Sequence, residues 1–201
     1  MNERPNAPAT ERNRDAILEV LTEEFGDRHE VLEIGSGTGQ HAVFFAGKLP
    51  HLTWQTSDVA ENHAGIQSWI ESENLSNAMP PLELDVEQTT QIEGHFDAVY
   101  SANTAHIMSE HAVACMFGLV GKLLPENGKF CLYGPFNRHG AFTSASNEQF
   151  DASLRQQNAS MGIRNLEDLE ALADSGGMHR TGLYAMPANN FLVVWRHAGI
   201  R

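Results

Sequence analysis

The stretch Val31-Leu32-Glu33-Ile34-Gly35-Ser36-Gly37-Thr38-Gly39 decides the fold, because an apolar run gives way to a turn with glycine at every second position. The apolar run is typical of a buried strand, and the segment Gln40 to Leu49 that follows is typical of a helix. Glycine allows backbone angles that a Cβ forbids, so such a turn can bring a ligand against the main chain. The free N–H groups of the following helix can hold a polar ligand.

The spacing of the glycines separates this loop from a dinucleotide fingerprint, which needs G-x-G-x-x-G after a strand. Gln40 stands where that fingerprint has its third glycine. The pattern E-x-G-x-G-x-G instead resembles the cofactor loop of the class I S-adenosylmethionine-dependent methyltransferases. The resemblance implies S-adenosylmethionine as cofactor, with the loop residues Glu33, Gly35, Ser36, Gly37 and Gly39 at its site. A purely structural glycine turn is the alternative.

Length and charge narrow the class of protein. We expect the 201 residues to form one domain, residues 1–201, with a continuous core. The net charge of −13, with 26 acidic against 13 basic side chains, predicts no nucleic acid or acidic membrane as the main partner. Without an apolar targeting or membrane-spanning stretch, we expect a soluble, cytoplasmic protein. No H-x-x-x-H pattern or carboxylate cluster occurs, so we expect no metal site.

Strand-like and helical segments alternate along the chain, which predicts a layered α/β domain with a mostly parallel sheet. Two extended segments near the C-terminus are joined by only Pro187-Ala188-Asn189-Asn190, so they must form an antiparallel hairpin. This pattern matches the Rossmann-like seven-stranded sheet of the methyltransferase fold, with helices on both faces and one strand running against the rest. The expected strands are 31–34, 52–56, 82–84, 96–101, 129–133, 181–186 and 191–196; the expected helices are 12–24, 40–49, 62–73, 108–124, 146–159 and 165–174.

Polar residues follow the predicted strands at the sheet edge where open α/β sheets bind ligands. Asp58 ends the second strand, and its carboxylate can accept both hydroxyl hydrogens of a ribose; capping of the next helix is the alternative. Asp85 follows the third strand and can accept from an adenine amino group, while Val86 offers a backbone N–H and an apolar contact. A simple turn aspartate is the alternative for Asp85.

The segment after the fourth strand, Ser101 to Met108, lies beside the methyl donor in methyltransferases. Asn103 can donate and accept hydrogen bonds at once, which suits the amino acid part of the cofactor or an acceptor atom. His106 is the best-placed general base, because the ordinary pKa of histidine lies near neutrality. A helix cap and a structural histidine are the alternatives.

Two further segments supply candidate contacts. The loop after the fifth strand predicts a substrate pocket formed by Tyr133, Phe136, Asn137 and His139, with an ordinary Gly-Pro turn as the alternative. The polar segment Asn6 to Arg14 is expected to be irregular before its helix. There Asn13 and Arg14 can close over the cofactor, with the planar fork of Arg14 offered to the methionine carboxylate; a solvated helix start is the simpler alternative.

Several segments also resemble a small family of bacterial and animal methyltransferase-like proteins that is catalogued as a domain of unknown function. This resemblance implies the fold and the cofactor, and leaves the acceptor open. The usual N/D-P-P-Y acceptor signature is replaced by Asn103-Thr104-Ala105-His106, which argues against methylation of an exocyclic amine. The segments are Asn6–Asn13, Glu33–Gln40, Asn103–Ile107, Gly134–Phe136, Ser144–Asn147 and Gly162–Arg164.

The sequence therefore predicts S-adenosylmethionine-dependent methyl transfer to an unidentified acceptor, which we expect to be a small molecule. Two alternatives belong to other classes: a scaffold protein that binds the cofactor without catalysis, and an NAD(P)-dependent oxidoreductase. The second needs a hydride-positioning pair such as Y-x-x-x-K, which is absent near the fifth strand. The oligomeric state does not follow from the sequence.

Overall fold

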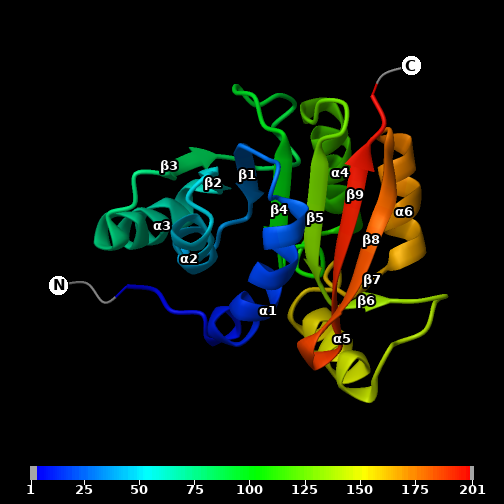
Figure 1. Ribbon diagram of the computed structural model, residues 1–201. Helices are drawn as coiled ribbons and strands as arrows, with labels where there is room; N and C mark the ends of the chain where they lie inside the picture. The colour runs from blue at the N-terminus through cyan, green and yellow to red at the C-terminus, as the bar shows by residue number, and fades with distance from the viewer. Residues whose placement is uncertain (1–3, 200–201) are drawn as a thin grey trace.

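The computed structural model describes residues 4–199. Its main sheet has seven strands in the order β3-β2-β1-β4-β5-β9-β8 (Figure 1). The strands are β1 (Glu30–Ile34), β2 (Thr53–Asp58), β3 (Ala78–Glu83), β4 (Ala98–Ala102), β5 (Lys129–Gly134), β8 (Met178–Met186) and β9 (Asn190–His197). The helices are α1 (Pro8–Glu24), α2 (Gln40–Lys48), α3 (Ala60–Glu73), α4 (Glu110–Leu123), α5 (Ala145–Gln157), α6 (Leu166–Ser175) and the short 3-10 helix η1 (Pro187–Asn189).

The predicted architecture is confirmed. Strands β3, β2, β1, β4 and β5 pair in parallel, and β9 pairs antiparallel with both β5 and β8, so β9 alone runs against the rest. The short connection between β8 and β9 does form a hairpin. A second sheet that the sequence did not predict contains only β6 (Phe136–Asn137) and β7 (Arg164–Asn165), paired in parallel.

The main sheet is buried on both faces, as expected for parallel strands with helices on each side. Neighbouring residues of one strand point to opposite faces, so Val31 packs in one core cluster and Leu32 in the other. Helices α1, α2 and α3 contribute to the first cluster, which includes Trp54 and Tyr100. Helices α4 and α6 contribute to the second, which includes Trp195.

Proline positions account for two differences from the predicted boundaries. Helix α1 begins at Pro8 rather than at Arg12, because proline is well suited to the first helical position, where no N–H is needed. Strand β3 begins at Ala78 and includes Pro80 and Pro81, which we expected to precede it. An edge strand tolerates proline because one of its sides has no neighbour to receive an N–H, and β3 is an edge.

The starts of α4 and α5 differ from the prediction through their caps. Helix α5 begins at Ala145 rather than Ser146, because the hydroxyl of Ser144 caps it by accepting from the N–H of Asn147 at 3.1 Å. Helix α4 begins at Glu110 rather than Met108, because Ser109 accepts from the N–H of Ala112 at 3.0 Å. Both hydroxyls satisfy a free N–H of a first helical turn.

No helix within residues 4–199 has both the length and the apolar character that crossing a membrane requires. In the same part of the chain, no three side chains of His, Cys, Asp or Glu are grouped so that they could hold a metal ion.

Close contact between α4 and α6 gives a test of this packing. A Cβ at Gly121 would lie 2.5 Å from the carbonyl oxygen of Gly176, whereas a Cβ at Gly118, one turn earlier, would meet nothing within 4 Å. We expect Gly121→Ala to lower the free energy of unfolding by about 1–3 kcal/mol, since a methyl group forced into a packed interface shifts its neighbours. The matched Gly118→Ala should raise it by up to about 1 kcal/mol, because alanine favours the helix. Urea unfolding of both variants measures this, and equal effects would contradict the packing of α6 on α4.

Candidate functional site

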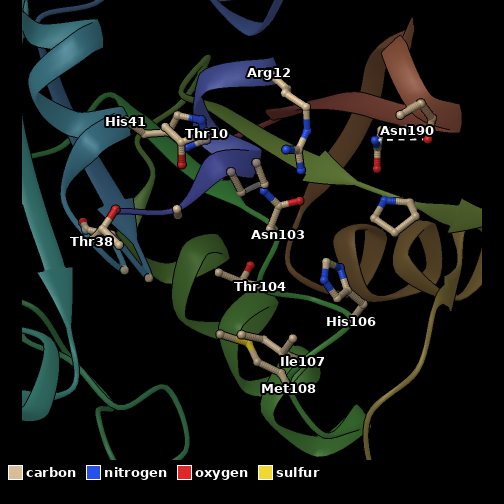
Figure 2. A pocket seen from close by; sticks show the side chains of 18 of the residues that line it. Thr10, Arg12, Thr38, His41, Asn103, Thr104, His106, Ile107, Met108 and Asn190 are labelled. Atoms are coloured by element: carbon tan, nitrogen blue, oxygen red, sulfur yellow. Dashed lines mark hydrogen bonds between the residues drawn. The ribbon is translucent and has the colours of Figure 1, made fainter. Parts of the chain in front are cut away.

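A cavity of about 760 Å³ opens at the carboxyl ends of the central strands (Figure 2). Its walls come from the N-terminal segment, the loops after β1, β2, β4 and β5, helix α5 and the β8–β9 hairpin. The lining residues are Ala7, Ala9, Thr10, Arg12, Glu33, Gly35, Ser36, Gly37, Thr38, His41, Asp58, Asn62, Ala102, Asn103, Thr104, His106, Ile107, Met108, Pro135, Ser146, Asn147, Phe150, Ala188 and Asn190.

The glycine loop forms the floor on the β1 side. Gly35, Gly37 and Gly39 have φ of 74°, 57° and 89°, a region that residues with a Cβ rarely adopt. A Cβ at Gly39 would lie 2.9 Å from the Cα of Ile66, so α3 packs directly on the loop. A Cβ at Gly37 would meet nothing within 4 Å, so that space belongs to the cavity. Of the three predicted cofactor-loop glycines, Gly35 and Gly37 line the cavity, whereas Gly39 lies behind it, against α3.

Glu33 lies beneath the loop in a closed set of hydrogen bonds. Its Oε2 accepts from the Ser36 hydroxyl at 2.9 Å and from Trp54 Nε1 at 3.1 Å. The Ser36 hydroxyl in turn accepts from the N–H of Ser57 at 3.1 Å, and the Ser57 hydroxyl donates to the carbonyl of Glu33 at 2.6 Å. Burial raises the pKa of Glu33 to about 7 against the opposing effect of the two donors. Glu33 is therefore a buried carboxylate that lines the cavity and titrates near neutrality.

Asp58 joins the loop to the start of α3. Its Oδ2 accepts from the N–H of Gly37 at 2.7 Å, and its Oδ1 accepts from the N–H of Val59 at 2.8 Å and from Asn62 Nδ2 at 2.9 Å. The carboxylate lies at the cavity wall with Asn62 beside it. Asp58 thus supports the loop and still presents Oδ2, which accepts a single bond, near the cavity.

The N-terminal segment closes the cavity on one side. The side chain of Gln40, the first residue of α2, accepts from the N–H of Ala7 at 2.6 Å and donates to Asn6 Oδ1 at 2.9 Å. These bonds hold the start of α1 against the glycine loop. Thr10 and Arg12 consequently reach the cavity, as Figure 2 shows.

Asn13 and Arg14, which we expected over the cofactor, do not line the cavity. Because α1 starts at Pro8, they lie in its second turn: Asn13 is buried with Oδ1 2.8 Å from Nε2 of His41, and the Arg14 guanidinium lies 4.6 Å from the ring centroid of Phe44. Arg12, which the sequence did not single out, is the arginine that faces the cavity.

The loop after β4 forms the opposite wall. Asn103 has a left-handed φ of 59° and its N–H donates to the carbonyl of Tyr133 at 2.9 Å. The next residue, Thr104, packs so closely that a Cβ at Gly35 would lie 2.6 Å from its Cγ2. Asn103 lines the cavity, and the loops after β1 and β4 pack against each other there.

His106 lines the cavity with its side chain largely buried. Its ring lies edge-on to the ring of Phe150, with 5.2 Å between centroids. Burial, and after it the charge of Arg164, lowers the pKa of His106 to about 4, so the imidazole is neutral at neutral pH. A neutral imidazole has one nitrogen free to accept a proton.

Arg164 holds the loop that carries His106. Its Nε donates to the carbonyl of Ala105 at 3.1 Å, its guanidinium also donates to the carbonyl of Met108, and a third bond reaches the carbonyl of Ser160 at 2.7 Å. The N–H of Gly162 donates to the carbonyl of His106 at 2.9 Å. The segment Gly162–Arg164 stood out in the sequence only through its family resemblance, which gave no role for it; here it fixes the loop.

The predicted substrate pocket after β5 is not where the cavity lies. Tyr133, Phe136 and Asn137 are buried and none of them lines it, and His139 is exposed with Nδ1 3.3 Å from Glu167 Oε1. The physical reason is the pairing of β6 with β7, which directs this segment away after Pro135. The wall is formed instead by Pro135, by Ser146, Asn147 and Phe150 of α5, and by Ala188 and Asn190 of the hairpin.

Asp85 and Val86 also lie outside the cavity. Asp85 accepts from the N–H of Glu87 at 3.0 Å and from Gln88 Nε2 at 2.7 Å, which is the turn role given above as its alternative. Val86 packs in the core cluster with α4 and α6.

Comparison with known proteins places the fold among methyltransferases. The model of a family described as "Protein of unknown function (DUF938)" matches residues 4–197. An O-methyltransferase family protein from Burkholderia thailandensis superposes with a TM-score of 0.80 at 14% identity, covering 93% of this chain and 57% of that chain. PigF, solved with SAH, gives 0.76 at 12% identity, covering 90% and 54%. An O-methyltransferase family 2 protein from Planctomyces limnophilus, in complex with apigenin, gives 0.74 at 13%, covering 91% and 61%.

Sequence identities of 12–14% show only that these proteins share a fold with this chain. The chain spans little more than half the length of the solved structures it matches. The class I methyltransferase fold predicted from the glycine loop and the C-terminal hairpin is confirmed.

The environment of His106 predicts its titration. We expect an NMR titration of the His106 ring to give a pKa about 4, and Arg164→Gln to raise it, because a nearby positive charge disfavours the imidazolium. The raised value should stay below 6.5, since burial is the larger cause. Arg138→Gln, at an exposed site, is the control and should leave the titration unchanged. A pKa near 6.5 in the unaltered protein would mean that His106 is solvated.

The raised pKa of Glu33 predicts that the stability of the protein depends on pH. Its pKa is about 7 in the folded protein against 4.5 as the ordinary value, so the folded state holds an extra proton between these pH values. Stability contributed by that proton is present below about pH 4.5 and is lost as the pH rises to about 7. Glu33→Gln has no such loss. The difference in unfolding free energy, variant minus unaltered protein, should therefore rise by on the order of 3 kcal/mol between about pH 4.5 and about pH 7. Urea unfolding at both pH values checks this, and a constant difference would contradict the burial of the charge.

Proposed function

The chain belongs to the family described as protein of unknown function DUF938, and we propose that it is an S-adenosylmethionine-dependent methyltransferase. The observation that carries the proposal is that the bare glycine loop lies beside two carboxylates, Glu33 and Asp58, on one side of the cavity, while the lining residues of α5, the β8–β9 hairpin and the loop after β4 add no acid. The fold supports it, because open α/β sheets bind ligands at the carboxyl ends of their strands.

The residues present fit the cofactor. Gly37 leaves open the space that a Cβ would fill, so a ligand can lie against the main chain of the loop. Asp58 can accept from ribose hydroxyls through Oδ2, with Asn62 beside it as a second polar group. Glu33 can offset positive charge on the amino acid part, and Asn103 can hydrogen-bond that part from the opposite wall. The adenine contact proposed for Asp85 has no support in its position.

When bound, S-adenosylmethionine supplies a reactive methyl group on a positively charged sulfur. The chain's task is then to align an acceptor, exclude water and remove a proton where the acceptor is a hydroxyl or thiol. For that proton we propose His106, which lines the cavity as a neutral imidazole; its pKa of about 4 makes it a weaker base than an ordinary histidine. The proton of an acceptor hydroxyl or thiol would pass to the free ring nitrogen of His106.

We propose a small-molecule acceptor, since α5 and the β8–β9 hairpin bound the cavity on the side away from the glycine loop. A scaffold protein that binds the cofactor without catalysis uses the same loop, so it differs only in the absence of methyl transfer.

Calorimetric titration tests the cofactor site. We expect S-adenosylmethionine and S-adenosylhomocysteine to bind and NAD not to bind. Asp58→Asn should weaken binding about tenfold or more, because hydrogen bonds to a charged acceptor contribute about 1.5–3 kcal/mol. Asp85→Ala is the matched control and should change the dissociation constant less than about twofold, since Asp85 bonds only within its own turn.

Absence of binding to the unaltered protein, or equal weakening by both variants, would contradict the proposal. Binding without transfer of a radiolabelled methyl group to any hydroxyl, thiol or carboxylate acceptor in a broad panel would favour the scaffold alternative.

A further inference from the structure

The cavity is divided by charge. Among the described residues that line it, the two carboxylates, Glu33 and Asp58, both come from the ends of β1 and β2, on the glycine-loop side. No acid is present among the lining residues of α5, the β8–β9 hairpin and the loop after β4. An ammonium group on an acceptor would therefore find no opposite charge on that side.

Arg12 is the one permanently charged base among these lining residues. In Figure 2 its side chain extends from α1 toward Asn103. Within residues 4–199 no carboxylate forms an ion pair with Arg12. An arginine without a partner at a cavity wall presents a planar pair of donors that matches a carboxylate.

Apolar side chains of the same cavity also face solvent. Ile107 is 49% exposed and Phe150 is 41% exposed, and Met108 lies beside them on the wall. Ile107 and Phe150 are two of the four large apolar side chains that are exposed among the described residues. Clustered exposed apolar groups mark a binding surface, because covering them removes apolar area from water.

We propose that the methyl acceptor is a small organic acid, whose carboxylate pairs with Arg12 and whose apolar body lies against Ile107 and Phe150. This inference rests on the proposed function. Arg12 is then the residue that determines specificity, and the neutral His106 beside Phe150 adds no charge that would compete for the anion. The overall charge of −13 repels anions at long range, so a local cation is needed to bind one.

Binding of matched acids and esters to the protein saturated with S-adenosylhomocysteine tests the proposal. The probes are benzoate, 4-hydroxybenzoate, phenylacetate and hexanoate, each beside its methyl ester. We expect at least one acid to bind about tenfold or more tightly than its ester, because the ester has no charged oxygens to accept hydrogen bonds from Arg12. Arg12→Gln should abolish that preference and leave the affinity for S-adenosylhomocysteine within about twofold. Arg14→Gln, two residues along α1 and outside the cavity, is the control and should keep the preference.

Three results would overturn the inference while the proposed function stands: no acid binds the complex, esters bind as well as acids, or Arg12→Gln removes S-adenosylhomocysteine binding itself. The last would assign Arg12 to the amino acid part of the cofactor. Failure of the unaltered protein to bind S-adenosylhomocysteine would contradict the proposed function and this inference together.

Discussion

The main chain between β1 and α2 turns through three glycines with positive φ, and the rest of the site depends on that turn. Gly35 must lack a Cβ for the loop after β4 to approach, Gly39 for α3 to approach, and Gly37 leaves the cavity open. Hydrogen bonds from this loop to Asp58 and to the carbonyl of Ser57 fix it to β2. One connection that only glycine can form without steric cost thereby sets the positions of three neighbouring elements.

Burial then sets the chemistry on each side of the cavity. Glu33 is held in a closed hydrogen-bond network with a raised pKa, which makes it responsive to a positive ligand. On the opposite side, burial lowers the pKa of His106 and keeps it neutral. Arg164, which does not line the cavity, holds the loop that carries His106, because it donates to backbone carbonyls on both sides of that residue. The result is a cavity whose two carboxylates lie together on the glycine-loop side, among the residues that the structure describes.

The sequence predicted the fold because its main signals are local. Glycine spacing after an apolar run identified the loop, and the four-residue connection before β9 required an antiparallel hairpin. Side-chain direction was less predictable, because it depends on where a helix begins: a start at Pro8 brings Arg12 rather than Arg14 to the cavity. The acceptor wall was missed because β6 and β7 have two residues each, too few for a periodic signal, yet their pairing carries Phe136 and Asn137 away. The helical pattern over 146–159 predicted α5, and family resemblance marked Ser144–Asn147, but neither indicated that this helix begins at the wall of the cavity.

The central claim is that the glycine loop, Glu33 and Asp58 form a cofactor site whose open side receives the acceptor. A crystal structure of the protein grown with S-adenosylhomocysteine tests it most directly. We predict that the ribose hydroxyls lie within hydrogen-bond distance of Asp58 Oδ2 and that the homocysteine part lies between the loop and Asn103. Ligand density elsewhere on the protein, or a cavity without density at saturating ligand, would contradict the claim.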